Sequence, residues 1–229
     1  MTDVRDRLAL ALDMPDVDDA ERLAKEVSSW FGIAKVGLEL FSAGGHDAIR
    51  RLRDLGFVVF ADLKFHDIPT TVQRAARVIG GLGVGYLNFH AAGGVDMLRA
   101  GVEGLHDGAR SAGFRLPVPI AVTVLTSDRD ASAFDERLRA AIDGGCGGVV
   151  CSVQEIAAVK RSRPEFKTIV PGVRFADDDR HDQSRIGTPA QVAAAGADIL
   201  VVGRAVTAAV DPRVAAAEVH AHVEATTRV

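Results

Sequence analysis

Short apolar runs alternate with helix-like segments along the whole chain, and this alternation restricts the possible fold more than any other feature. A short apolar run bounded by turn residues is typical of a buried strand, and apolar residues at helical spacing indicate a helix. We expect strands at residues 8–13, 33–38, 58–64, 86–90, 119–125, 148–151, 168–173 and 198–202. We expect helices near residues 16–30, 45–55, 70–81, 94–105, 131–144, 153–160, 189–195 and 205–225.

Eight strand-then-helix units within 229 residues predict an α/β fold, a single-domain TIM (β/α)8 barrel. A doubly wound sheet is the alternative, but it usually has fewer strands and often a glycine-rich first turn, and no GxGxxG follows the first expected strand. No linker, low-complexity tract or fixed-period repeat divides the sequence. We therefore expect one domain over residues 1–229.

The composition excludes several classes of protein. With 48% hydrophobic and 25% charged residues, the chain has the composition of an ordinary soluble globular protein. Its net charge of −4 does not indicate a nucleic-acid-binding protein, and no apolar run approaches the length of a membrane span. The first residues lack a signal-peptide pattern. We expect a cytoplasmic protein that binds neither nucleic acid nor membrane.

The two cysteines, Cys146 and Cys151, flank one expected strand. The length of this strand would place the two cysteines too far apart to form a disulfide. No CxxC motif or His/Cys cluster indicates zinc, so both are expected to be buried small hydrophobic residues.

The third expected strand ends in an alternating row of charges, Asp62, Lys64 and Asp67. Side chains alternate across a strand, so Asp62 and Lys64 share one face. Asp67 lies just beyond the strand, because Pro69 cannot continue a β-ladder. Burying charges is costly unless each one is paired, and an acid–base–acid row supplies this pairing. A structural ion network is the alternative interpretation, but charge clusters at strand ends favour a catalytic role.

Other polar residues also end expected strands or lie within them. They are Asp13, Lys35, Thr126, Arg174 and the pair Gly203-Arg204. Any one of them alone could be a helix cap or a turn residue. Because barrel active sites form at the carboxyl ends of the strands, we expect the set to converge with the charged row into one polar basin.

The loops after the seventh and eighth expected strands contain residue types suited to phosphate. Residues 171–174 read Pro-Gly-Val-Arg, and Gly203-Arg204 open the last expected helix. Glycine permits close backbone approach, a helix N-terminus favours an anion, and arginine offers a bidentate fork. A surface salt bridge is the alternative for Arg204. Gln183 lies in the long loop at residues 175–187, which we expect to act as a lid over the phosphate.

Over essentially its whole length the sequence resembles the orotidine 5′-phosphate decarboxylase family. The matching segments are residues 10–13, 35–37, 62–69, 122–127, 171–174, 182–183 and 202–204. The segment at residues 62–69, Asp-Leu-Lys-Phe-His-Asp-Ile-Pro, is highly specific, and the ordered set is more so. The family often has Asn where Thr70 stands and Thr where Val170 stands, and neither departure touches the charged row.

This resemblance implies a homodimeric lyase that converts orotidine 5′-monophosphate to uridine 5′-monophosphate and CO₂ in pyrimidine biosynthesis, without a metal or organic cofactor. By match to the family, Lys35, Asp62, Lys64 and Asp67 would form a catalytic tetrad, of which Lys35 and Asp62 also bind the substrate, as does Thr71. Lys64 would be the proton donor. The partner subunit would supply Asp67, and Thr71 would also reach across the subunit boundary.

The same resemblance implies the substrate contacts. Asp13 and Lys35 would hold the ribose, and Thr126 the pyrimidine. Gln183, Gly203 and Arg204 would hold the phosphate, with Arg174 nearby.

Two other functions stay open. A Mg²⁺-dependent sugar-phosphate decarboxylase or aldolase of the same superfamily shares an Asp-x-Lys-x-x-Asp row, but the continuation through Asp67 to Pro69 and the expected lid residue Gln183 argue against it. A non-catalytic nucleotide-phosphate binding protein is the second, and the intact charged row argues against that.

Overall fold

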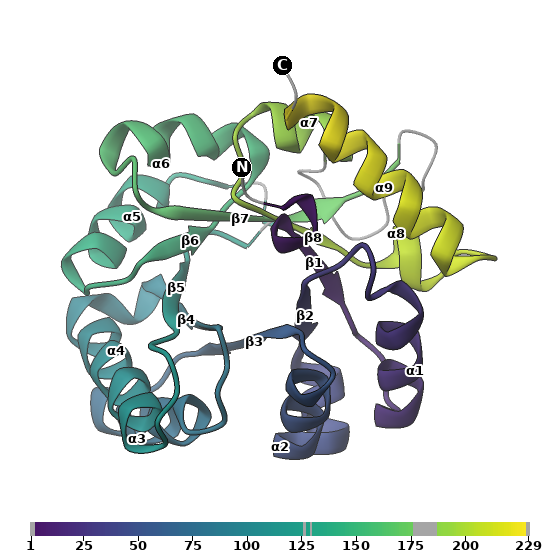
Figure 1. Cartoon of the computed structure of the whole chain (residues 1–229). Helices are drawn as coiled ribbons and strands as arrows, with labels where there is room; N and C mark the ends of the chain where they lie inside the picture. The colour runs from purple at the N-terminus through teal and green to yellow at the C-terminus, as the bar shows by residue number, and fades with distance from the viewer. Residues whose placement is uncertain (1–2, 126, 129, 176–186, 228–229) are drawn as a thin grey trace.

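The computed structural model of the protein describes residues 3–125, 127–128, 130–175 and 187–227. Eight strands form a closed barrel in chain order, and each pairs in parallel with its neighbours (Figure 1). They are β1 Leu8–Ala11, β2 Ile33–Val36, β3 Val58–Phe65, β4 Tyr86–His90, β5 Val118–Val122, β6 Gly148–Val150, β7 Lys167–Val173 and β8 Ile199–Val202. The predicted TIM barrel is confirmed.

Helices surround the strands, as Figure 1 shows. They are α1 Val17–Val27, α2 Leu38–Asp54, α3 Pro69–Gly80, α4 Gly94–Ser111, α5 Phe134–Asp143, α6 Ile156–Ser162, α7 Pro189–Ala194, α8 Arg204–Thr207 and α9 Pro212–Thr227. Three short 3₁₀ helices, η1 Val4–Arg7, η2 Ala91–Gly93 and η3 Val153–Glu155, complete the described elements. No helix among the described residues is long and apolar enough to cross a bilayer.

Two of the expected helices have different bounds in the structure. The segment expected at residues 45–55 begins at Leu38 instead, with a non-helical break at Gly45, whose φ is 52°. The segment at residues 205–225 contains the closing helix, as expected, but this helix is α9 and begins only at Pro212, after the single turn of α8. Asp211 accepts hydrogen bonds from the backbone N–H groups of Arg213 and Val214, so it caps a new helix that begins at Pro212.

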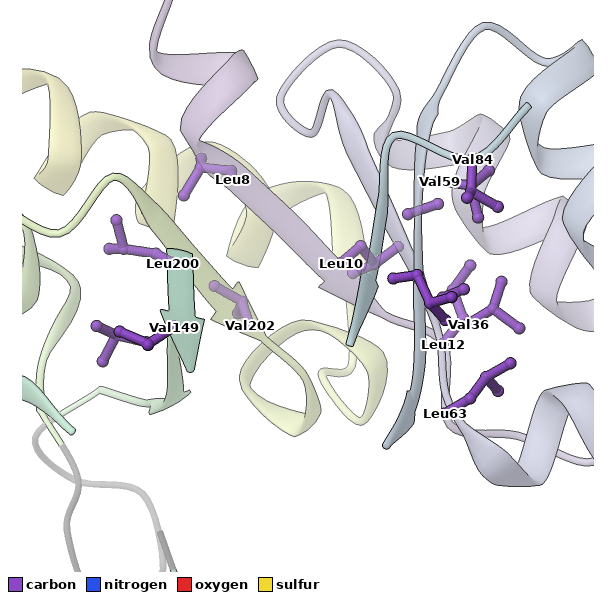
Figure 2. Packing of buried hydrophobic residues seen from close by; sticks show 14 of the residues in the cluster. Leu8, Leu10, Leu12, Val36, Val59, Leu63, Val84, Val149, Leu200 and Val202 are labelled. Atoms are coloured by element: carbon purple, nitrogen blue, oxygen red, sulfur yellow. The ribbon is translucent and has the colours of Figure 1, made fainter. Parts of the chain in front are cut away.

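Strand side chains alternate between the barrel interior and the layer beneath the helices. The interior is filled by apolar residues that include Ile33, Phe60 and Ile120. Alternate residues pack in the larger outer cluster, part of which appears in Figure 2, where Leu8 of β1 and Leu200 of β8 come from paired positions of adjacent strands. Because the centre of the barrel is packed, a ligand site has to form at one end of the strands.

Two strands lose their regular register near their carboxyl ends. The pairing of β3 with β4 shifts between Ala61 and Phe65, and that of β7 with β8 shifts between Val170 and Val173. Such bulges bend a strand and change the direction of its side chains, and they are frequent beside active sites.

The helices that follow β3 and β4 pack unusually close together. A Cβ atom added at Gly104 of α4 would overlap the backbone carbonyl of Gln73 in α3, and one added at Gly108 would overlap that of Arg77. Glycine therefore lets the two helix backbones touch. This contact holds α3 against α4 behind β4 and behind β3, which carries Asp62 and Lys64 of the charged row.

Both cysteines are buried and neither forms a disulfide, as predicted. Burial raises the pKa of the Cys146 thiol to about 12, so this thiol stays protonated at neutral pH. They act as small hydrophobic residues of the core.

Candidate active site

A cavity of about 500 Å³ opens at the carboxyl end of the barrel. A volume of this order suits a small-molecule ligand. Its described lining comes from all parts of the barrel except β4 and comprises Ala11, Asp13, Lys35, Phe60, Asp62, Lys64, Val122, Val124, Leu125, Ser127, Val150, Ile169, Pro171, Gly172, Val173, Arg174, Val201, Gly203, Arg204 and Thr207. The predicted polar basin is therefore present, with an apolar floor.

Four charged side chains form a continuous alternating chain along one wall of the cavity. Lys35 Nζ lies 2.9 Å from Asp13 Oδ1 and 3.3 Å from Asp62 Oδ2. Lys64 Nζ donates to the other oxygen of Asp62, Oδ1, at 2.6 Å. The Lys35 side chain is only 9% exposed, whereas that of Lys64 is 34% exposed, so Lys64 is the more accessible of the two ammonium groups.

Electrostatics keeps the inner pair of this chain ionised. Burial by itself would lower the pKa of Lys35, but the carboxylates of Asp62 and Asp13 outweigh it, and the pKa is raised. Burial would likewise raise the pKa of Asp62, but Lys35 and Lys64 hold it below its ordinary value. Each charge is thus stabilised by an opposite charge, as a buried row requires.

Gly37 makes room for the ion pair of Asp13 and Lys35. A Cβ atom at this position would overlap the Asp13 carboxylate and would approach Lys35 Nζ to 3.0 Å. A side chain here would therefore push Asp13 and Lys35 apart.

The backbone of Lys64 has an unusual conformation. Its φ of 50° lies in the left-handed region, and among the described residues it is the one such position not occupied by glycine. This conformation is disfavoured for residues with a Cβ and is commonly retained only at functional sites. It falls inside the bulge of β3 and turns the Lys64 side chain toward Asp62.

Asn88 of β4 is part of this arrangement, and the sequence reasoning missed it. The side chain is fully buried, its Oδ1 accepts from Lys64 N at 2.7 Å, and its Nδ2 donates to Asp62 Oδ1 at 2.6 Å. An amide in the middle of an apolar strand was the available signal, because a buried Asn needs partners for both its donor and its acceptor.

The opposite wall of the cavity carries the residues predicted to hold phosphate. Gly172, with a φ of 77°, lies in the bulge of β7. Arg174 follows it and is buried, while Gly203 and the exposed Arg204 come from the end of β8. The helix after Gly203 is a single turn, so an anion there would depend on backbone N–H groups and arginine rather than on a long helix dipole.

Two predicted site residues stay outside the cavity of this chain. Asp67 and Thr71 are exposed at the start of α3, and neither belongs to the described lining. The Asp67 carboxylate accepts from the backbone N–H of Ile68 at 2.6 Å. The Ile68 side chain beside it is 66% exposed.

Two further predicted residues, Thr126 and Gln183, lie outside the described residues, together with most of the expected lid loop. Leu125 and Ser127, which flank Thr126 in the chain, both line the cavity.

His66 and His90 stack on each other with their ring centroids 5.5 Å apart. Burial and the nearby Arg137 lower the pKa of His90, and its Nδ1 accepts from the backbone N–H of Ala92. Neither histidine belongs to the described lining of the cavity. Among the described residues, no three His, Cys, Asp or Glu side chains gather into a group that could hold a metal ion.

Comparison with protein families gives one model that covers most of the chain. Residues 6–219 match the model described as "Orotidine 5′-phosphate decarboxylase / HUMPS family".

Individual relatives agree with this match. The chain is 44% identical to an orotidine 5′-phosphate decarboxylase of Moorella thermoacetica over 96% of its own length and 93% of the relative's. It is 45% identical to one of Anaeromyxobacter sp. (strain K), covering 92% of this chain and 95% of the relative. Among solved structures, an orotidine 5′-phosphate decarboxylase from Lactobacillus acidophilus superposes with a TM-score of 0.81 at 31% identity, covering 95% of this chain and 99% of the other.

Proposed function

The chain belongs to the orotidine 5′-phosphate decarboxylase / HUMPS family, and on this premise we propose that it decarboxylates orotidine 5′-monophosphate to uridine 5′-monophosphate and CO₂ in pyrimidine biosynthesis. The observation that carries the proposal is the alternating chain of Asp13, Lys35, Asp62 and Lys64 on the wall of a 500 Å³ cavity. The names of the relatives at 44% and 45% identity support the choice of substrate.

The reaction needs a group that can stabilise a carbanion. When the bond to the carboxylate breaks, CO₂ leaves and the electron pair stays on the ring carbon, where the pyrimidine delocalises it poorly. The Lys64 ammonium stabilises this developing charge and then transfers one N–H proton to the carbon. The resulting neutral amine regains a proton from solvent.

Asp62 contributes in two ways to this step. Its bond of 2.6 Å orients the Lys64 ammonium. Its negative charge lies next to the place of the leaving carboxylate, so it disfavours the bound substrate more than the transition state, in which that charge moves away. Lys35 keeps Asp62 ionised from the other side.

The rest of the substrate is held away from the reacting carbon. Asp13 and Lys35 bind the ribose hydroxyls, and Thr126 contacts the pyrimidine. Arg174, Gln183, Gly203 and Arg204 bind the phosphate. Binding energy from the phosphate then holds the ring in position against Lys64.

The proposed active protein is a cytoplasmic homodimer in which the whole chain of 229 residues forms one domain. Asp67 and Thr71 of each subunit enter the site of the other and complete it. Their exposure at the start of α3, beside the exposed apolar side chain of Ile68, supports an interface at this position.

Mixing two inactive variants tests the shared site. Lys64→Ala and Asp67→Ala, dissociated and reassociated at random, give half mixed dimers, each with one intact site, so about a quarter of the wild-type activity returns. Lys64→Ala mixed with Asp62→Ala is the matched control, because both residues reach a site from the same chain, so each site of the mixed dimer keeps one lesion and no intact site forms. If the first mixture recovers no more activity than the second while subunit exchange is demonstrated, Asp67 acts within its own chain.

The reaction is proposed to need no metal or organic cofactor, and one assay tests both substrate and cofactor. Purified protein is mixed with orotidine 5′-monophosphate in excess EDTA, and the absorbance change of the pyrimidine is followed. Turnover in EDTA supports the proposal. Absence of turnover, with activity on a sugar phosphate acid that appears only on addition of Mg²⁺, would favour a sugar-phosphate decarboxylase or aldolase.

A further inference from the structure

The bulge of β3 removes regular strand pairing from the residues that carry the charges. Ala61 pairs with Leu87 of β4, and the next registered pair is Phe65 with Phe89. Three residues of β3, from Asp62 to Lys64, therefore stand opposite one residue of β4, which is Asn88. A bulge of this kind leaves backbone groups without their ladder partners.

The Asn88 side chain takes over one of these lost contacts. The backbone N–H of Lys64 donates to Asn88 Oδ1 at 2.7 Å, in place of a carbonyl of the neighbouring strand. This bond holds Lys64 at its φ of 50°, a backbone conformation that residues with a Cβ rarely adopt.

The other end of the same amide holds the carboxylate. Asn88 Nδ2 donates to Asp62 Oδ1 at 2.6 Å, and this is the oxygen to which Lys64 Nζ also donates at 2.6 Å. The second oxygen, Oδ2, is then directed to Lys35 Nζ at 3.3 Å. The two partners also fix the orientation of the amide, because a backbone N–H requires the oxygen and an ionised carboxylate requires the NH₂ group.

From these contacts we propose that Asn88 is a positioning residue, which fixes the Asp62 carboxylate and the Lys64 ammonium relative to each other by binding the side chain of one and the backbone of the other. Asn88 does not belong to the described lining of the cavity, so it acts through these two residues. It lies on the neighbouring strand β4 and is fully buried, with an exposure of 0%. The catalytic consequence rests on the proposed decarboxylation, whereas the structural consequence for Lys64 does not.

Two variants separate the two contacts. Asn88→Ala removes both. Asn88→Asp has nearly the same shape and keeps an acceptor for the Lys64 N–H, but it replaces the donor to Asp62 by a second carboxylate. Thr168→Ala is the matched control: Thr168 is equally buried, and its hydroxyl hydrogen-bonds with Asp198 at the opposite end of the barrel.

The kinetic readout is the division between kcat and KM. Misplacing a reacting group by about 1 Å can cost about 10²-fold in rate, so we expect Asn88→Ala to lower kcat about 10²-fold while KM for orotidine 5′-monophosphate changes little. Thr168→Ala should keep the wild-type kcat even where its thermal unfolding temperature falls. A kcat of Asn88→Ala within threefold of wild type, about the scatter expected among neutral variants, would overturn the proposal.

The pH profile adds a signature that a purely structural role would not produce. Two adjacent carboxylates share one proton at low pH and repel each other once both ionise. We therefore expect kcat of Asn88→Asp to fall as the pH rises through the neutral range, which neither wild type nor Asn88→Ala should show. A flat profile for this variant would mean that Asn88 does not bear on Asp62.

A readout without turnover separates failure of this inference from failure of the proposed function. Amide hydrogen exchange at Lys64, followed by NMR, should be protected in wild type and in Asn88→Asp but fast in Asn88→Ala. Unchanged protection in Asn88→Ala overturns the positioning role. Protection lost as expected, in a protein that does not convert orotidine 5′-monophosphate, would reject the proposed function and leave the positioning role in place.

Discussion

Two networks that each join one aspartate to two lysines lie at opposite ends of the barrel, one centred on Asp198 and one on Asp62. The Asp198 carboxylate, just before β8, accepts from Lys160 Nζ at 2.8 Å and Lys167 Nζ at 3.4 Å, and the backbone and hydroxyl of Thr168 fill its remaining positions. Burial would raise the pKa of each of the two carboxyl groups, but its hydrogen bonds and lysines lower it. By residue type and electrostatics the two networks are alike.

They differ in what surrounds them. The Asp198 network connects the residue before β8 to the start of β7 and to Lys160 of α6, and none of its members belongs to the described lining of the cavity. Asp62 and Lys64 do line the cavity, and Lys64 has the disfavoured backbone conformation. In a barrel the amino ends of the strands mainly contribute stability, and the carboxyl ends carry the chemistry. We infer that position in the barrel, rather than residue type, distinguishes the Asp198 network from the network to which we assign the proposed catalysis.

The largest expected effect comes from removing one lysine of each network. Lys64→Ala should lower kcat by about 10³-fold or more, because it removes the group that we propose stabilises and protonates the carbanion, while the fold and nucleotide binding remain. Lys160→Ala should keep the wild-type kcat and unfold at a lower urea concentration. Steady-state assays and urea titrations of both variants measure this. Substantial turnover by Lys64→Ala, or a large loss of kcat in Lys160→Ala, would break the comparison.

Within the cavity itself, the wall that carries the residues proposed to bind phosphate should contribute to substrate binding more than to the decarboxylation step. Arg204→Ala should weaken kcat/KM by about 2–3 kcal/mol, the range for a lost charge-assisted hydrogen bond. Arg161→Ala, an exposed arginine of α6, is the control and should behave as wild type. Added phosphite dianion should activate the turnover of a substrate that lacks the phosphate less in Arg204→Ala than in wild type. An unchanged kcat/KM would mean that the phosphate binds elsewhere.

The same substitution at the two aspartates should have different consequences, and the smaller one is at Asp198. Asp198→Asn keeps the shape of the side chain but weakens its bonds to Lys160 and Lys167, so we expect a loss of about 1–3 kcal/mol in the free energy of unfolding, with kcat unchanged. Asp62→Asn should instead abolish most turnover. Equal loss of kcat in the two variants would show that the amino end of the barrel also controls the chemistry.

Most of the fold could be predicted from the sequence, because short apolar runs and amphipathic segments are local signals. Strand β4 has the predicted bounds of 86–90, and the other strands differ by a few residues at their ends. The start of the last helix was also readable, since Asp211 followed by Pro212 is a helix-start signal.

The site was predictable only in part. Strand alternation was enough to place Asp62 and Lys64 on one face. The role of Asn88 depends on the register of β3 against β4, and a register shift is a property of two paired strands that neither strand's sequence displays. Position at or within an expected strand pointed to Lys35 and Lys64, yet Lys160 and Lys167 form a network of the same chemistry around Asp198. Residue type alone therefore does not show whether a lysine belongs to a structural network or to the candidate site, and its position in the fold is needed to decide.

Acid sensitivity gives the smallest expected effect and sharpens the comparison further. The pKa values of Asp62 and Asp198 are both lowered in the folded chain, so each ionised carboxylate stabilises the fold above its ordinary pKa of 3.8, and this stabilisation is lost as the pH falls through the lowered value. Replacing either group by Asn removes its contribution to the pH dependence.

Between about pH 5 and pH 2 the free energy of unfolding should therefore fall more in wild type than in Asp62→Asn or Asp198→Asn. The extra fall in wild type should be a few tenths to about 1 kcal/mol relative to each variant. Urea titrations across this range measure the slopes, and a slope in either variant as steep as in wild type would mean that its carboxylate is not held ionised by the fold. The proposed nucleotide site lies at the carboxyl end, so adding uridine 5′-monophosphate should change the acid slope attributable to Asp62 and leave that of Asp198 as it was.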